Sequence, residues 1–142
     1  MARAEYIQPN PEEWMQKFRF HSTVRVRFCE TDMSGHVNNT NHLVYFEQGR
    51  TDYLEKINLY EFNLAVMTAD ICCHYLSEAF YMDVLQVGVR ISRMGNSSLD
   101  MEYYLFCEER NTLVATGKGT IVVVDRETKK STPIPLEIRR RV

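Results

Sequence analysis

The chain has 142 residues, of which 44% are hydrophobic and 25% are charged. This length suits one domain, which can bury roughly two-thirds of the surface of its unfolded chain. Lys and Arg number 17 against 19 for Asp and Glu, so no overall basic field favours nucleic-acid binding. The N-terminus has no apolar signal core, and no stretch approaches the roughly 20 apolar residues of a membrane span. We therefore expect a soluble, cytoplasmic protein that binds neither nucleic acid nor membrane.

The four cysteines are Cys29, Cys72, Cys73 and Cys107. They lack CxxC spacing and the density of a secreted disulfide scaffold, and each falls in a strand-like run. The pattern predicts reduced thiols in the core.

Residues 1–19 are expected to form an extension ahead of the main domain. Asn10-Pro11-Glu12-Glu13 combines a helix N-cap, a proline at the first helical position and a capping acid. Trp14 and Phe18 then predict a short amphipathic helix. Its tryptophan is expected either to cover a sheet edge or subunit contact, or to pack on its own domain.

The segment from Phe20 to Cys29 has apolar residues mostly at even positions, which predicts a half-buried strand. A run rich in Asp, Ser, Gly and Asn follows, and these residues cap helix starts, so a helix should begin near Asn39 to Asn41. The helix itself is indicated by side chains at three- and four-residue spacing: Leu43, Phe46, Arg50, Tyr53, Leu54 and Ile57.

The rest of the chain predicts four more strands: residues 65–76, 84–93, 99–108 and 113–125. Gly117 and Gly119 share one strand face and should mark places where another backbone or the helix comes close. A short helical turn is expected after Thr132-Pro133.

This order of elements favours an α+β fold in which one long helix is wrapped by a five-stranded antiparallel sheet. The sequence thus predicts a single domain over residues 20–142. Its polar loop leads directly into a helix N-terminus, where free N–H groups can bind a carbonyl oxygen that gains negative charge. Asp32 is the carboxylate nearest that point.

Two motifs carry a family resemblance. Thr31-Asp32-x-x-Gly35-His36-Val37-Asn38-Asn39, followed by Tyr45-Phe46-Glu47-x-x-Arg50, resembles the 4-hydroxybenzoyl-CoA thioesterase family of hot-dog-fold acyl thioesterases. Weaker matches continue through Gly95-x-Ser97-Ser98 and Pro133-Ile134-Pro135. Asn39 stands where many relatives have His, and the His-Val-Asn-Asn form resembles a subgroup that includes acyl-carrier-protein thioesterases.

The resemblance implies hydrolysis of acyl-CoA without a cofactor, in a homodimer or homotetramer whose active sites lie between subunits. Asp32 would be the general base or nucleophile, with His36 and Asn39 as further catalytic residues. Substrate contacts would come from Gly35, Asn38, Glu47, Arg93, Ser97 and Ser98.

Other interpretations of these residues stay open. Asp32 is also suited to capping loop N–H groups, His36 to bonding backbone, and Glu47 to pairing with Arg50 at i+3. A Cys29–His36 nucleophilic pair ranks below Asp32. The His and Asp residues form no compact metal motif, so we expect no metal. Two other functions are a thioesterase acting on acyl-carrier protein and a hot-dog domain that binds acyl thioesters without cleaving them.

Overall fold

A computed structural model describes residues 4–142, and only the first three residues of the expected 1–19 extension lie outside it. The elements in chain order are α1 (Pro11–Met15), β1 (Phe20–Arg25), a 3-10 turn (Phe28–Glu30), α2 (Asn39–Lys56), a second 3-10 turn (Leu59–Phe62), β2 (Leu64–Tyr75), β3 (Val84–Met94), β4 (Ser98–Cys107), β5 (Thr112–Asp125) and α3 (Leu136–Arg141). No helix in this part of the chain is long and apolar enough to cross a membrane.

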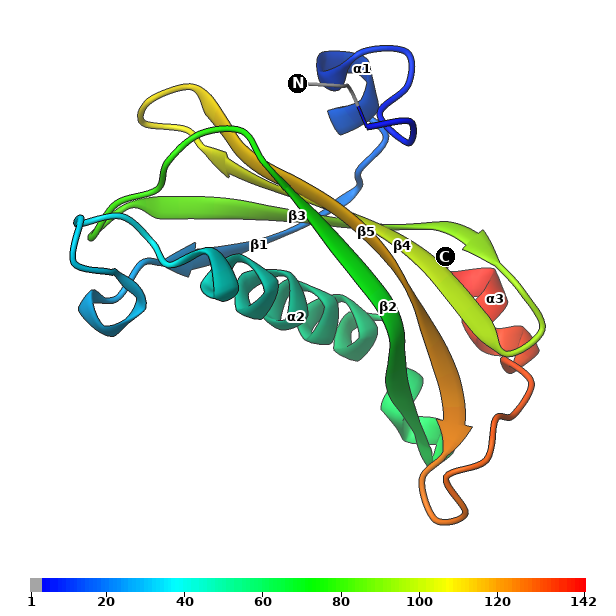
Figure 1. Cartoon of the computed structure of the whole chain (residues 1–142). Helices are drawn as coiled ribbons and strands as arrows, with labels where there is room; N and C mark the ends of the chain where they lie inside the picture. The colour runs from blue at the N-terminus through cyan, green and yellow to red at the C-terminus, as the bar shows by residue number, and fades with distance from the viewer. Residues whose placement is uncertain (1–3) are drawn as a thin grey trace.

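One sheet contains all five strands, in the order β1-β3-β4-β5-β2. Each neighbouring pair is antiparallel, and the twisted sheet curves around α2 (Figure 1). This confirms the predicted α+β class with one long helix against a five-stranded antiparallel sheet. Strands β1 and β2 are the edges of the sheet, so each has one side without a strand partner within residues 4–142.

Helix α2 buries the face that carries Phe46 and Leu54, as its spacing predicts. Phe46 stacks on Tyr103 of β4 at 5.0 Å between ring centroids. A side chain at Gly117 would meet Phe46 at 2.6 Å, and one at Gly119 would meet the Ile71 Cα at 2.9 Å. Both glycines therefore lie where the helix or a neighbouring strand comes close, which confirms the expectation drawn from their position in the sequence.

The other face of the sheet is covered by the N-terminal segment. Trp14 is fully buried, and its Nε1 donates to Glu102 Oε2 on β4 at 2.8 Å. Glu102 Oε2 also accepts from Arg90 Nε on β3 at 2.6 Å. Asn10 caps α1 as predicted. Of the two roles expected for Trp14, the structure shows packing within its own chain.

The predicted first strand is too long at its C-terminal end. Strand β1 stops at Arg25, and residues Phe28–Glu30 form a 3-10 turn. The turn forms because the buried Glu30 carboxylate accepts the Arg27 N–H at 2.8 Å, an interaction that alternation does not reveal. Cys29 is therefore exposed on this turn, and the prediction of a core thiol is wrong there. Cys107 is buried and Cys72 and Cys73 are half-buried; all four thiols are free.

Candidate active site

The loop between Glu30 and Asn38 is a small, tightly bonded hairpin. Thr31 and Val37 form an isolated β-bridge, and the Asp32 N–H donates to the His36 carbonyl at 2.8 Å. Gly35 closes the tip at a φ of +83°, a conformation that glycine adopts without a Cβ penalty. Asp32 Oδ1 accepts the Ser34 N–H at 2.8 Å, and Oδ2 has no hydrogen-bond partner within residues 4–142. Asp32 thus caps its loop with one carboxylate oxygen and leaves the other available to bind a ligand or water.

Helix α2 begins directly after this loop. Asn38 is the N-cap, and its side-chain oxygen accepts the Thr40 N–H at 3.0 Å. The N–H of Asn39 has no partner in the described part of the chain. The first N–H groups of a helix lack carbonyl partners, so this group is free to bind an oxygen at the positive end of the helix dipole.

The three predicted catalytic residues, Asp32, His36 and Asn39, line one pocket of about 370 Å³. The other lining residues are Val37 and His42 with Tyr75, Leu76, Ser77, Glu78 and Ala79, which follow the end of β2. The β2–β3 connection is held against the loop because the Val37 N–H donates to the Ala79 carbonyl at 2.8 Å. The pocket is therefore built from two segments that are about 40 residues apart in sequence.

His36 is paired with a residue that sequence reasoning did not identify. Its Nδ1 lies 3.1 Å from Glu78 Oε1, and its ring stands edge-on to Phe80. A carboxylate bound to one ring nitrogen fixes the orientation of an imidazole. Tyr75 is a second such residue, and its hydroxyl donates to the Asn39 carbonyl at 2.7 Å. Nothing near Tyr75 or Glu78 in the sequence signals these contacts.

His42 is a further polar residue of the pocket for which the sequence predicted no role in the chemistry. It lies one turn into α2, is only 4% exposed and packs edge-on against Tyr75. Burial lowers the pKa of His42, and the nearby carbonyls of Asn38 and Asn39 only partly oppose this effect. Its Nδ1 forms no well-aligned hydrogen bond within residues 4–142. His42 thus brings a neutral imidazole to the pocket. Its helical spacing from Asn39 could have revealed this position.

Asp32 also borders a second, open hollow of about 730 Å³. The hollow is mostly apolar, because Phe28, Met33 and Tyr81 contribute to it together with Cys29, Thr31 and Gly35. Phe28 and Tyr81 pack edge-to-face at 5.7 Å between ring centroids. Asp32 therefore lies between a pocket of mixed polar and apolar lining on the side of α2 and an apolar surface on the side of the 3-10 turn.

The remaining predicted site residues are spread over the molecule. Gly35 shapes the loop, and Asn38 caps the helix. Glu47 is exposed on α2 and forms no ion pair with Arg50 in the described chain. Arg93, Ser97 and Ser98 lie at the far end of β3 and β4 (Figure 1). Strand β3 starts beside the Asp32 loop and is 11 residues long, so about 35 Å of extended chain separates its two ends.

No cluster of three or more His, Cys, Asp or Glu residues in the described chain has the arrangement of a metal site. The pocket offers a carboxylate, an imidazole–carboxylate pair and free backbone N–H, which together suit attack on a carbonyl group.

The chain is similar to known proteins in both sequence and fold. The thioesterase-like superfamily matches residues 26–142. The uncharacterized protein YsmA of Bacillus subtilis is 37% identical over 128 residues, covering 89% of this chain and 86% of that protein. The acyl-CoA thioesterase YbgC of Haemophilus influenzae is 31% identical, covering 84% of this chain and 91% of that protein.

Among solved structures, the PA5185 protein of Pseudomonas aeruginosa superposes with a TM-score of 0.81 at 25% identity, covering 89% of this chain and 91% of that one. The α+β arrangement is accordingly the hot-dog fold that the sequence motifs suggested. The superfamily match spans the Asp32 loop, all of α2 and strands β2 to β5. This chain belongs to the thioesterase-like superfamily.

Proposed function

We propose that this protein hydrolyses acyl-CoA thioesters to a free acid and CoA. One observation carries the proposal: a single pocket is lined by Asp32 and by Asn39 at the start of α2, and within residues 4–142 one Asp32 carboxylate oxygen and the Asn39 N–H have no hydrogen-bond partner. A base and an oxyanion donor are the two groups that thioester hydrolysis needs most. Membership of the superfamily supports the same chemistry, and YbgC of H. influenzae is named for it.

In the proposed reaction Asp32 removes a proton from water, and the resulting hydroxide attacks the thioester carbon. The carbonyl oxygen becomes an oxyanion that accepts a hydrogen bond from the Asn39 N–H. Collapse of this intermediate breaks the C–S bond. The departing thiolate takes the proton that Asp32 removed from water, which restores the Asp32 carboxylate. A thiol pKa of about 8.5 makes sulfur a good leaving group, so no strong acid is required. Asp32 can alternatively attack the carbon itself, and water then hydrolyses the anhydride.

His36 and Asn39 have supporting roles in this proposal. The Glu78 carboxylate holds the His36 ring, which can then orient the attacking water or the thioester carbonyl. The Asn39 side chain lies at the same end of the helix and can hold the water by its amide. Gly35 and Asn38 contribute by shaping the loop and the helix start rather than through their own chemistry.

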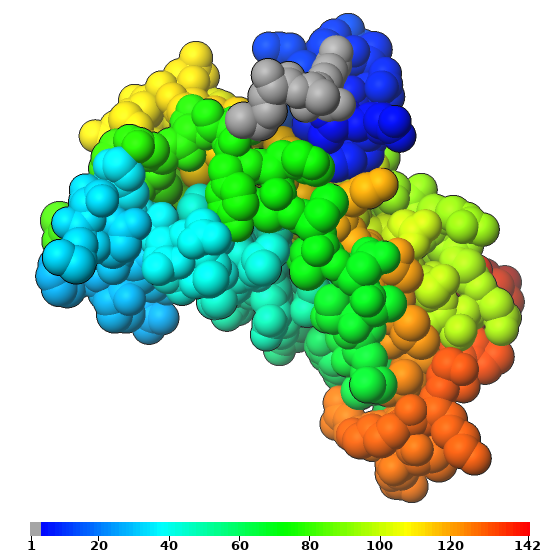
Figure 2. Space-filling model, in the orientation of Figure 1, coloured from blue at the N-terminus to red at the C-terminus, as the bar shows by residue number. Residues whose placement is uncertain are grey.

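We also propose that the active form is at least a homodimer, with a tetramer as a further pairing. The free edge of β2 offers unpaired backbone groups to a second copy. Helix α2 also remains visible at the surface beside β2 (Figure 2), and exposed apolar side chains such as Val44 and Met67 lie on these two elements. Arg93, Ser97, Ser98 and Glu47 would then contact substrate held largely by the partner. A stable, active monomer in sedimentation experiments would contradict this part of the proposal.

The test is thiol release by the purified protein from a panel of aromatic, short-chain and long-chain acyl-CoA thioesters, each compared with the matching acyl-carrier-protein thioester. We expect turnover of at least one acyl-CoA at a kcat on the order of 1 s⁻¹ or more. Release from the carrier-protein substrates alone would overturn the choice of carrier. Tight binding of acyl-CoA by calorimetry with no thiol release from any substrate would identify a non-catalytic binding domain instead.

A further inference from the structure

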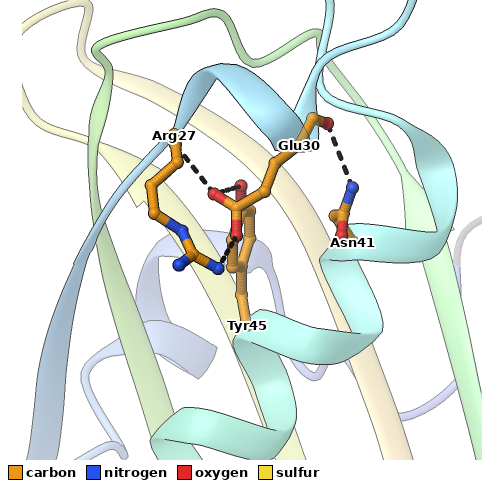
Figure 3. Close-up of polar contacts among 4 residues, drawn as sticks. All are labelled: Arg27, Glu30, Asn41 and Tyr45. Atoms are coloured by element: carbon orange, nitrogen blue, oxygen red, sulfur yellow. Dashed lines mark hydrogen bonds and ion pairs between the residues drawn. The ribbon is translucent and has the colours of Figure 1, made fainter.

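Glu30, two residues before Asp32, is a buried carboxylate whose oxygens are both occupied (Figure 3). The residue is 6% exposed. Oε1 accepts the Arg27 N–H at 2.8 Å and the Tyr45 hydroxyl at 3.1 Å, while Oε2 accepts Arg27 Nη2 at 3.2 Å. A charge this deeply buried is costly unless it is paired and hydrogen-bonded. The arrangement therefore fixes the 3-10 turn to Tyr45 on α2.

The backbone of Glu30 is tied to the same helix by separate bonds. Its carbonyl accepts the Asn38 N–H at 2.8 Å and the Asn41 Nδ2 at 3.0 Å. Asn38 is the cap of α2 and Asn41 lies in its first turn (Figure 3 shows the Asn41 contact). Glu30 is thus bound to α2 at its carboxylate by Tyr45 and at its carbonyl by Asn38 and Asn41.

This double attachment determines where Asp32 can lie. Consecutive Cα atoms are about 3.8 Å apart, so Asp32 is within about 7.6 Å of chain from Glu30. Beyond Glu30, the Thr31–Val37 bridge and the Asp32 N–H bond to His36 hold the hairpin to itself rather than to α2. The chain also runs directly from the hairpin into α2 through Val37 and Asn38, and Glu30 adds the carboxylate and carbonyl bonds to α2 that help to relate Asp32 to the N–H of Asn39 at the helix start.

We propose that Glu30 is a positioning residue for the reaction, and that Tyr45 and Asn41 act through it to hold Asp32 in register with the N-terminus of α2. The proposal rests on the proposed function, because it assigns Glu30 a role in catalysis at Asp32. Glu30 does not line the Asp32 pocket, so it acts without touching substrate. A misplacement of about 1 Å at a reacting group can reduce turnover about a hundredfold.

The first test compares Tyr45→Phe with Tyr53→Phe. Tyr45→Phe removes only the hydroxyl that binds Glu30, and Tyr53 is a half-buried tyrosine two turns further along α2 whose hydroxyl has no partner within residues 4–142. We expect kcat to fall about tenfold in Tyr45→Phe, with KM within about twofold of the parent, and neither to change in Tyr53→Phe. An equal loss in both variants would overturn the proposal, because it would reflect general packing of the helix.

The second test breaks the other attachment. Asn41→Ala removes the side-chain donor to the Glu30 carbonyl and leaves the carboxylate network intact. Hydrogen exchange should then speed up at the Asn38 and Asp32 amides in both Asn41→Ala and Tyr45→Phe, while the amides of β3 and β4 stay protected as in the parent. Faster exchange confined to the loop, together with lower kcat, supports positioning. A loop as protected as in the parent, or uniform loss of protection across the sheet, contradicts it.

The third measurement, the pH dependence of kcat, tests whether the charge of Glu30 matters in addition to its shape. Burial alone would raise the pKa of Glu30, but the bonds from Arg27 and Tyr45 outweigh it and hold this pKa below its ordinary range. Arg25 is a further charged group on this side of the 3-10 turn, since it lines one crevice together with Arg27, Glu30 and Tyr45. Tyr45→Phe removes one of the bonds, so the pKa of Glu30 rises and the acid limb of kcat should move to higher pH. Tyr53→Phe should leave that limb in place, and a shift in both variants or in neither would contradict the role of Glu30.

The parent protein and Asp32→Asn are assayed alongside these variants. Thiol release by the parent and its loss in Asp32→Asn establish that the proposed reaction is being measured. Full parental kcat in Tyr45→Phe and Asn41→Ala under those conditions refutes positioning by Glu30 and leaves the proposed function standing. No release by the parent refutes the proposed function, and with it a role for Glu30 in that reaction.

Discussion

Substitution of Gly119 by Ala should destabilise the sheet at the bulge in β2. An added Cβ would contact the Asp70 carbonyl oxygen, the Ile71 Cα at 2.9 Å and the Asp70 carbonyl carbon at 3.1 Å. These are backbone atoms of a paired strand, so they cannot rotate away as a side chain can. Overpacking of this kind costs about 1–3 kcal/mol, and the lower entropy of the unfolded Ala chain returns about 0.4–1 kcal/mol.

These figures span a net loss of about 0–2.6 kcal/mol, and because all three contacts are with backbone we expect about 1–2 kcal/mol. Unfolding entropy of about 2.1 cal/mol/K per residue over 142 residues corresponds to about 0.3 kcal/mol/K, so Tm should fall by roughly 3–7 °C. The assay is thermal unfolding followed by circular dichroism at one fixed protein concentration, because association makes Tm concentration-dependent.

Gly95→Ala is the matched control. Its added Cβ would meet the Ser98 hydroxyl at 2.7 Å, and that hydroxyl can rotate away, so we expect Tm to change by less than about 2 °C. The reasoning is refuted if Gly119→Ala melts with the parent, because the β2 backbone would then move aside freely.

Three further substitutions test the buried polar groups. Glu30→Gln should reduce the free energy of unfolding at about pH 7. The pKa of Glu30 is lowered in the folded state, so the stability that its charge contributes is lost as the pH falls through that lower pKa. The difference in unfolding free energy between variant and parent, measured by denaturant titration, should therefore disappear at low pH. Burial lowers the pKa of His42, so as the pH falls the unfolded chain takes up a proton at this residue before the folded chain does, and stability decreases. His42→Phe should therefore make the free energy of unfolding less dependent on pH between about 7 and 5. An unchanged slope of unfolding free energy against pH would contradict a neutral buried His42. Trp14→Phe removes the donor to Glu102 and part of a fully buried ring, so thermal unfolding should show a loss of about 2–3 kcal/mol in stability. The variant should keep the parental kcat. A lower kcat would mean that the N-terminal segment influences the pocket.

The sheet and helix could be predicted because each has one face in a continuous core. Alternate residues of β4, from Leu99 to Cys107, are almost fully buried, and such a face produces a two-residue period in the sequence. Phe46 and Leu54 produce the corresponding helical period on α2. The turn at Phe28–Glu30 produces no period, because one buried carboxylate holds it. Alternation therefore extended the first strand too far and placed Cys29 in the core.

Residues on the outer face of the sheet illustrate the same limit. Glu102 and Tyr104 alternate with core residues, which predicts exposure, yet both are buried under the N-terminal segment. Arg90, on the neighbouring strand β3, donates its Nε to Glu102 there. A period of two indicates which residues share a face, but it does not indicate whether a distant segment covers that face.

The candidate site was predictable where its residues are adjacent in sequence. Asp32, His36 and Asn39 come from one loop and helix start, and they line one pocket. Glu78 and Tyr75 join them only because the β2–β3 connection folds back on the loop through the bond from Val37 to Ala79. A contact of this kind depends on strand order, which local patterns do not specify.

The most direct test of the account is the turnover of Asp32→Asn, measured with its Tm and its affinity for a non-hydrolysable acyl-CoA analogue on the same preparation. The Asn side-chain oxygen can still accept the Ser34 N–H, so we expect folding and binding of the analogue to persist. The lost carboxylate should lower kcat at least about a hundredfold. A folded Asp32→Asn protein that binds the analogue and keeps near-parental turnover would remove Asp32 from the mechanism. The chemistry would then have to come from His36 or from Cys29, which lines the hollow beside Asp32.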